Sequence, residues 1–141
     1  KLDKASMFST QMLGADLSMA SLEGATIAAD LYKANLRGAN FKNAMMGADM
    51  KNQSMGIMAL KAKKAFFDNA DLSGADLSRT DLEYASFRNA NLSNVNLEFA
   101  KLTGANFVGA NLTNTNFTNA ELGANHFCGS IGLDKAIGLK K

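Results

Sequence analysis

Several residue types are missing or nearly missing from this chain, and each absence excludes a class of protein. The 141 residues include no Pro, no Trp, one Cys and one His. A single Cys excludes an internal disulfide framework and a multi-cysteine zinc site. No apolar run approaches the length of a membrane span, and we expect neither such a span nor a signal segment. Fifteen basic and thirteen acidic residues give a net charge of +2, typical neither of a nucleic-acid arm nor of an acidic tail.

The chain is rich in Ala, used 23 times, and Asn, used 15 times, a bias that indicates an internal repeat. From Ala65 it runs in units of five, AFFDN ADLSG ADLSR TDLEY ASFRN ANLSN VNLEF AKLTG ANFVG ANLTN TNFTN. We call the third residue of each unit its central position. If the spacing between units changes at three places, 24 central positions can be assigned, and all of them hold Leu, Phe, Met or Ile. Ala stands two residues before 17 of them. These positions are 12, 17, 22, 27, 31, 36, 41, 46, 50, 55, 60 and 67, and then every fifth residue to 127.

This pattern resembles the pentapeptide-repeat family, whose units follow A(D/N)LXX. The resemblance implies an all-β fold, a right-handed quadrilateral β-helix in which four units make one coil. The period itself agrees, because five matches neither the 3.6 residues of a helix nor the alternation of a long strand. On a short extended side, the small residue and the Leu or Phe two positions later point to the same face, which we expect to be the interior.

A coil of twenty residues predicts which side chains stack. One predicted internal column contains Ile27, Met46, Phe67, Phe87, Phe107 and Phe127. The central positions 27 and 31, and likewise 46 and 50, are four residues apart instead of five. These two shortened units are 19 residues apart, so the missing residues fall at the same corner of successive coils. We therefore predict a single solenoid of about six coils over residues 1–130, interrupted by a bulge or loop near 61–66, and a C-terminal cap or tail over 131–141.

The third change of spacing, from 60 to 67, surrounds the basic residues Lys61, Lys63 and Lys64. They form either a protruding basic loop or a solvated bulge, and the bulge is the favoured interpretation. A short helix over Ser54–Ala65 is a further alternative.

The outward residues define two candidate partner-binding groups. In the predicted register Asp30, Asp49 and Asp71 stack as an acidic stripe for a basic partner. The alternative, which we favour, is that Asp and Asn at this position make local backbone hydrogen bonds at the corners. Met45 and Phe66 are predicted to be neighbours on another face, either as an exposed contact surface or with Phe66 folded under the bulge.

The sequence offers no catalytic site, metal site or cofactor motif. His126 and Cys128 are both predicted to point outward, and side chains two residues apart seldom form a thiolate–imidazole pair. Asn125, the nearest candidate to orient such a pair, is predicted to point inward. One His with one Cys cannot supply the three or four ligands of a metal site. We therefore expect no enzyme activity.

The favoured function is a non-enzymatic protein-interaction or scaffold module, for example an accessory subunit of a larger assembly. The alternative that the resemblance implies is a DNA-mimic modulator of DNA gyrase or topoisomerase. A rod of six coils, about 29 Å tall, would need on the order of 17 negative charges to match duplex DNA. Residues 1–64 carry a net charge of +4 and residues 65–130 a net charge of −4, so the rod is a dipole instead.

Direct nucleic-acid binding is a third and unlikely function, because the basic residues are predicted to lie on several sides without an aromatic row. These residues are Lys33, Arg37, Lys42, Lys51, Lys61, Lys63 and Lys64. The sequence does not identify the protein partner. A second copy of the chain, bound through the C-terminal cap as a homodimer, is one alternative. Proteins that resemble this chain occur in the bacterial cytoplasm and in the chloroplast thylakoid lumen, and the expected location is one of these two.

Overall fold

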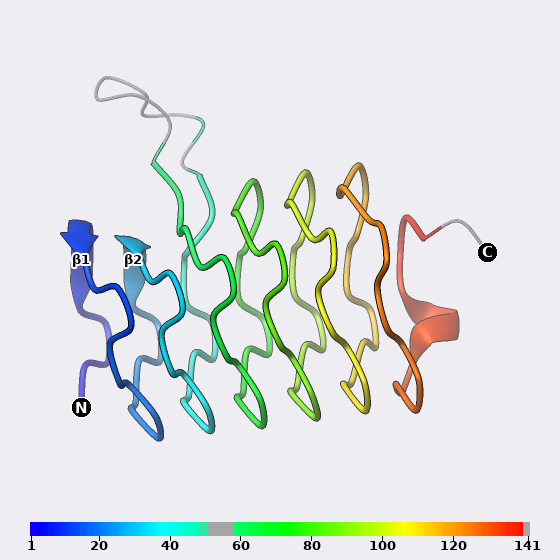
Figure 1. The fold of residues 1–141 in the computed structure, drawn as a ribbon, viewed down its shortest axis with the longest axis horizontal. Coiled ribbons are helices and arrows are strands. Elements are labelled where there is room, and N and C mark those ends of the chain that lie inside the picture. Colours follow the sequence, from blue (N-terminus) through cyan, green and yellow to red (C-terminus); the bar gives the residue numbers. More distant parts are fainter. Residues whose placement is uncertain (49, 51–57, 140–141) are drawn as a thin grey trace.

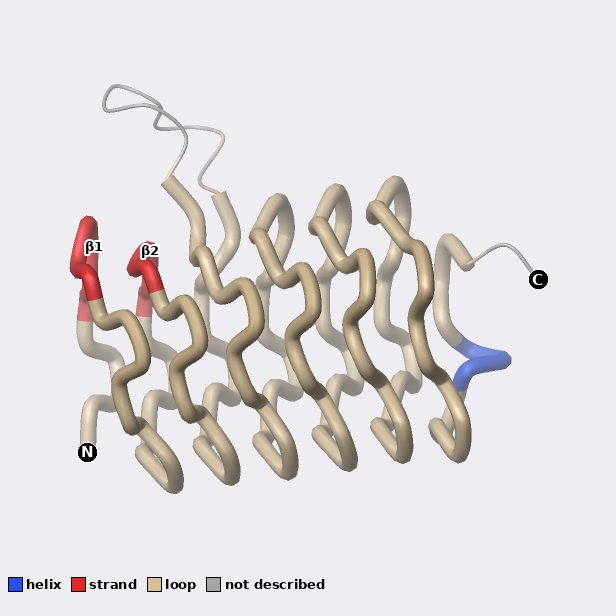
Figure 2. Tube along the Cα trace, in the orientation of Figure 1, coloured by secondary structure: helices blue, strands red, loops and turns tan. Residues whose placement is uncertain are grey.

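A computed structural model describes residues 1–48, 50 and 58–139, and it has the form of a β-helix-type solenoid. Successive coils stack along one axis, with β1 at one end and a short 3₁₀ helix at the other (Figure 1). The named elements are β1 (Ser6–Gln11), β2 (Thr26–Asp30) and the 3₁₀ helix Leu133–Lys135. Figure 2 shows that the rest of the described chain consists of short extended sides and turns. Among the described residues, no helix is long and apolar enough to cross a membrane.

The residue before each central position pairs with its equivalent in the next coil, always in parallel. Within the described part of the chain these pairs form four ladders. Ladder 1 runs through Asp16, Asn35, Phe66, Ser86, Asn106 and His126; ladder 2 through Ser21, Asn40, Asp71, Asn91, Asn111 and Ile131; ladder 3 through Ser6, Thr26, Met45, Asp76, Asn96, Asn116 and Ile137; ladder 4 through Gln11, Asp30, Lys61, Asp81, Lys101 and Glu121. Each pair is flanked by backbone hydrogen bonds, such as Leu72 N–H to Asn91 O at 2.8 Å.

Inward side chains fill the rod, as the period of five predicts. The central residues from Leu22 to Met46 and from Leu60 to Phe117 are at most 2% exposed, whereas Met50, also predicted to be central, is 43% exposed. The rings of Phe67, Phe87, Phe107 and Phe127 form one column, with successive centroids 5.0, 5.3 and 5.2 Å apart and nearly parallel. Burial of each such side chain contributes about 1.5–3 kcal/mol, and the small residue two positions earlier leaves room for it.

The corners are four-residue turns that require a left-handed residue. In the turn from Leu72 to Ala75, Ala75 N–H donates to Leu72 O at 3.0 Å and Gly74 has φ 71°. A positive φ at the third residue is the signature of a type II turn, which favours Gly or Asn there. At Gly74 a side chain would also collide with Asn43 from the preceding coil. Gly adopts this conformation without strain, and other corners hold Asn at the same position, as Asn69 does with φ 60°.

The predicted register is correct from Phe67 onward and wrong where it crosses residues 46–66. Ladder partners are 20 residues apart after Phe66, but Asn35 and Phe66 are 31 apart. The extra residues enter after Met46, because Leu60 N–H donates to Met46 O at 2.9 Å and so closes the turn across the insertion. Residues 61–66 are therefore regular, not a bulge, and the described residues 58–65 of the alternative helix contain no helix. The predicted central position 55 lies outside the described residues.

The unit that follows the insertion carries its two inward residues in reverse order. Leu60 occupies the place of the usual small residue, and Ala62 occupies the central place. Both side chains are fully buried. A large residue at one inward position is thus balanced by a small one at the other, so the coil keeps its inward volume.

The single missing residue between Ile27 and Leu31 explains where the two named strands form. With one residue fewer, the corner between ladders 3 and 4 has no room for a turn, and β2 runs straight through it. β1 pairs with β2 in parallel and accommodates its own extra residue as an irregularity between Phe8 and Gln11. Met46 and Leu60, which border the insertion, lie at this same corner, because Met45 belongs to ladder 3 and Lys61 to ladder 4.

Candidate functional site

The ladder Asp and Asn side chains serve their own corners. Asp71 Oδ1 accepts hydrogen bonds from the backbone N–H of Ser73 at 3.0 Å and from its hydroxyl at 2.7 Å. Asn111 does the same with Thr113, at 3.1 and 2.7 Å. The favoured prediction of local backbone hydrogen bonds is therefore confirmed. It accounts for Asp and Asn at these positions without a ligand.

The predicted acidic stripe does not form, because the insertion shifts its members onto different ladders. Asp30 lies in ladder 4 beside Lys61, and Asp71 lies in ladder 2 beside Asn40. Asp49 lies outside the described residues. Binding of a partner by any one of these carboxylates stays a prediction, but Asp30 and Asp71 are not neighbours.

Met45 and Phe66 are also not neighbours. Met45 lies in ladder 3 and Phe66 in ladder 1, which run along opposite sides of the coil. The guanidinium of Arg37 stacks over the Phe66 ring at 4.1 Å, and its Nε lies 3.3 Å from Asp68 Oδ2. Phe66 is half-buried under this ion pair, not under a bulge. Met45, in contrast, is 60% exposed.

Asp3 and Asp68 each close a turn of the next coil, which the sequence did not suggest. At Ser86, where a ladder Asp or Asn would close its own corner, Asp68 of the preceding coil accepts hydrogen bonds from the Ser86 hydroxyl and from Arg88 N–H. Asp3 accepts from the hydroxyl of Ser21 and from the following turn in the same way. Ser at a ladder position is the signal that would have predicted this device, because its side chain is too short to close the turn itself.

Hydrogen bonds lower the pKa of two carboxyl groups, those of Asp3 and Asp16. The Ser21 hydroxyl is the main cause that lowers the pKa of Asp3 below its ordinary value. Hydrogen bonds from the hydroxyl and backbone N–H of Ser18 lower the pKa of Asp16 in the same direction. In both cases the bonds favour the charged carboxylate.

The basic residues predicted to form a loop lie within the regular coil. Lys61 is a ladder residue, while Lys63 and Lys64 form the next turn. Lys63 Nζ lies 3.5 Å from Glu83 Oε2. Lys33 occupies the equivalent turn of the preceding coil, since its N–H donates to Lys63 O at 3.1 Å. The shifted register thus brings Lys33 beside the three later lysines, whereas Arg37 and Lys42 follow ladders 1 and 2 and lie on other corners.

The corner between ladders 3 and 4 is where the described rod departs most from the repeat. It holds the missing residue, the irregularity in β1 and the insertion. Phe8, which is 56% exposed, pairs with Ala28 in β2, and the exposed Met45 lies in ladder 3. A polar cavity of about 220 Å³ also lies at this corner, lined by Ser9, Thr10, Gln11, Ala28, Ala29, Asp30, Met58, Ala59 and Lys61.

The repeat matches the sequence profile of the family described as Pentapeptide repeats (8 copies) over residues 27–52, 61–94 and 90–123. The chain belongs to the pentapeptide-repeat family. The match breaks beside the insertion, between residues 52 and 61. Pentapeptide-repeat proteins are generally non-enzymatic structural modules, and the match indicates no catalytic family.

Solved structures of pentapeptide-repeat proteins are similar to this chain. Rfr23 from the cyanobacterium Cyanothece 51142 is 24% identical, with 94% of this chain and 86% of that chain covered and a TM-score of 0.53. QnrB1, a plasmid-mediated fluoroquinolone resistance protein, is 17% identical, with coverages of 93% and 78% and a TM-score of 0.50. A protein from the Arabidopsis thaliana thylakoid lumen is 39% identical, with coverages of 76% and 68% and a TM-score of 0.34. Comparison with curated proteins finds no match.

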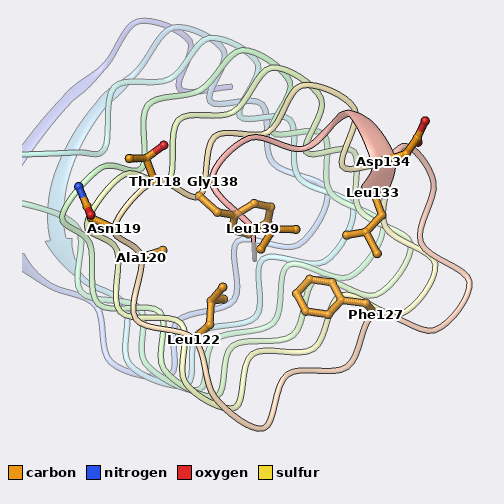
Figure 3. Close-up of a pocket in the computed structure, with 10 residues that line it drawn as sticks. Thr118, Asn119, Ala120, Leu122, Phe127, Leu133, Asp134, Gly138 and Leu139 are labelled. Carbon is orange, nitrogen blue, oxygen red and sulfur yellow. The ribbon is translucent and has the colours of Figure 1, made fainter. Parts of the chain in front are cut away.

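The C-terminal end of this pentapeptide-repeat rod holds a cavity of about 1020 Å³. Ile131 and Ile137 continue ladders 2 and 3, and the 3₁₀ helix lies between them. Figure 3 shows Leu139, Leu133 and Phe127 converging over the open end of the lumen. The lining is Phe117, Thr118, Asn119, Ala120, Leu122, Phe127, Leu133, Asp134, Gly138 and Leu139. The tail therefore covers part of the last coil and leaves an apolar hollow.

His126 and Cys128 are exposed, as predicted, and Asn125 points inward. The Asn125 amide donates to Leu102 O at 2.6 Å and to Ala105 O at 3.1 Å, so it satisfies backbone carbonyls of the preceding coil and does not orient the His. Within the described ranges, no three His, Cys, Asp or Glu side chains are grouped to hold a metal ion.

Proposed function

We propose that this protein is a non-enzymatic interaction module that binds a protein partner through the outer surface of a rigid rod. In this proposal the rod is a right-handed quadrilateral β-helix of about six coils over residues 1–130, and residues 131–141 cap it. Membership of the family and the ladders support this geometry. Buried side chains fill the coils from Leu22 to Phe117, so the proposed contact surface lies on the outside of the rod.

The observation that carries the proposal is the irregular corner between ladders 3 and 4. The Asp and Asn side chains of the regular ladders are engaged by their own turns, as those of Asp71 and Asn111 are. At this corner the repeat is interrupted three times, and Phe8 and Met45 expose large apolar side chains. Exposed apolar residues beside an interruption of a regular surface are typical of a contact site.

The other residues singled out by the sequence stay individual predictions. Asp30 lies next to the irregular corner in ladder 4 and belongs to the proposed contact surface. Phe66 and Asp71 lie on other sides of the rod. A role as accessory subunit of an assembly, a homodimer through the C-terminal cap, and a location in the bacterial cytoplasm or thylakoid lumen are further parts of the proposal.

The experiment is native purification with chemical cross-linking, followed by mass spectrometry of the stoichiometric partner. The double variant Phe8→Asp with Met45→Asp should lose the partner, while its melting temperature stays near that of the wild type because both side chains are exposed. Met19→Asp is the matched control, since Met19 is 79% exposed on a different corner. Retention of the partner by the double variant, or its loss in the control, would contradict the proposal.

The alternative of a DNA mimic that acts on gyrase rests on the fold it shares with QnrB1. Charge argues against it, because ladder 4 alternates in sign through Asp30, Lys61, Asp81, Lys101 and Glu121. Ladders 2 and 3 carry Asn in place of Asp toward the C-terminal end. We expect no inhibition or rescue of gyrase supercoiling at micromolar protein, and either effect would favour the mimic.

A further inference from the structure

Four lysines form a compact basic corner, defined as Lys33, Lys61, Lys63 and Lys64. The turns that carry them stack directly, because Lys33 N–H donates to Lys63 O at 3.1 Å and Lys64 N–H donates to Glu83 O at 2.9 Å. Equivalent residues of stacked coils lie about 4.8 Å apart. Lys33 and Lys64 therefore hold two like charges side by side along the rod.

Three of the four ammonium groups have no ion-pair partner among the described residues. Lys63 is paired with Glu83 at 3.5 Å. Lys33, Lys61 and Lys64 are exposed and have no such pair, although Lys33 Nζ lies 5.3 Å from the centre of the Tyr32 ring. The half of the chain before residue 65 also carries the excess of positive charge, +4. The ammonium groups of this corner would therefore attract a negatively charged ligand.

The surroundings restrict what kind of anion fits. Asp30 and Asp81 flank Lys61 in ladder 4, and Glu83 lies beside Lys63. A nucleic acid carries a phosphate at every nucleotide, so its strand would meet these carboxylates as well as the lysines. A short cluster of carboxylates avoids this difficulty, because it does not extend over Asp30, Asp81 and Glu83.

We propose that the basic corner binds an acidic segment of a partner protein, with Glu or Asp side chains placed between Lys33, Lys61 and Lys64. This inference rests on the proposed function and names the chemistry of the partner. The basic corner borders the irregular corner through ladder 4, so one partner can contact exposed apolar side chains and lysines together. Complementary charge of this kind sets orientation and association rate.

The test measures binding of fluorescein-labelled hexaglutamate to the full chain by fluorescence anisotropy at low salt. Lys33→Gln with Lys64→Gln should weaken binding about tenfold, and salt should weaken it further. Gln replaces Lys at the same positive φ, so the fold is expected to persist, and its melting temperature checks this. Lys42→Gln with Arg88→Gln is the matched control, which removes two exposed charges from other corners and should change binding less than about twofold.

Three outcomes would overturn the inference. These are absence of hexaglutamate binding to the wild type, equal loss in the control variant, and tighter lysine-dependent binding of a twelve-nucleotide oligothymidylate than of hexaglutamate. Failure here is distinguishable from failure of the proposed function. Suppose that the cross-linked partner still binds Lys33→Gln with Lys64→Gln but no longer binds Phe8→Asp with Met45→Asp. This result would support the interaction module and contradict binding of an acidic segment.

Discussion

At the scale of single residues, the rod depends on hydrogen bonds that close its corners. Most ladder Asp and Asn side chains close their own turn, whereas Ser21 and Ser86 depend on an Asp from the preceding coil. The backbone N–H of this turn thus has two kinds of acceptor, the ladder residue of its own turn or an Asp of the preceding coil. Substitutions that replace one acceptor by the other test their equivalence.

Asp68→Ala should destabilise the protein by about 1–3 kcal/mol, because it leaves Arg88 N–H and the Ser86 hydroxyl without their acceptor. Asp68→Asn keeps an acceptor oxygen and should cost less. Adding Ser86→Asn to Asp68→Ala should recover part of the loss, since Asn at a ladder position closes its own turn. Urea unfolding measures all four proteins. Equal stability of Asp68→Ala and the wild type, or no recovery, would contradict this account.

Acid should weaken the protein through Asp3 and Asp16. Their pKa values are lower in the folded chain than in the unfolded chain, so the unfolded state binds protons first as the pH falls. Their contribution is therefore complete above about pH 4 and is lost below it. Thermal unfolding at about pH 6 and about pH 3 should show a smaller decrease in melting temperature for Asp3→Asn with Asp16→Asn than for the wild type. An equal decrease would show that these hydrogen bonds do not matter.

At the scale of elements, each coil is a packing unit with a fixed inward volume. The unit with Leu60 and Ala62 keeps that volume in reversed order. Leu60→Ala should cost about 2–5 kcal/mol through the cavity it leaves. Ala62→Leu should cost about 1–3 kcal/mol through overpacking.

The double variant Leu60→Ala with Ala62→Leu restores the usual order and should be more stable than either single variant. Its loss should therefore be well below the sum of the two, which is the signature of coupled neighbours. Denaturant unfolding of the three variants measures this coupling. Additive losses would mean that the two side chains do not share one space.

The sequence predicted the regular elements and failed at one junction. Strict spacing of Leu and Phe after Phe67 made every later column correct. Before it, Met50, Met55 and Leu60 fit the period in hydrophobicity, and this agreement hid the insertion. The signal against Met55 and Leu60 is the residue two positions earlier, because Gln53 and Met58 replace Ala there, whereas Met50 follows Ala48 and gives no such signal.

This one error in register affected the prediction of the candidate site more than the prediction of the fold. The acidic stripe and the pairing of Met45 with Phe66 both required neighbours across the junction, and neither exists. The basic corner was missed for the same reason, since Lys33 and Lys64 meet only in the shifted register. Local properties, such as the inward Asn125 and the corner role of Asp71, needed no register and were predicted correctly.

At the scale of the whole molecule, the solenoid is a tube filled by buried side chains from Leu22 to Phe117, and we propose that its outer corners bind the partner. Its dipole follows from the sequence, with +4 before residue 65 and −4 over residues 65–130. The basic corner and the irregular corner both lie in the positive half. Which surfaces are neighbours is determined by the register across the insertion, so the functional proposals depend on it.

Cysteine cross-linking tests that register most directly, in a background of Cys128→Ser. Ladder neighbours lie close enough for a disulfide, whose Cα atoms are about 4.4–6.8 Å apart. The account predicts that Asn35→Cys with Phe66→Cys oxidises to an internal disulfide in the folded protein, and that Met45→Cys with Phe66→Cys does not. A disulfide in the second pair and none in the first would contradict the account.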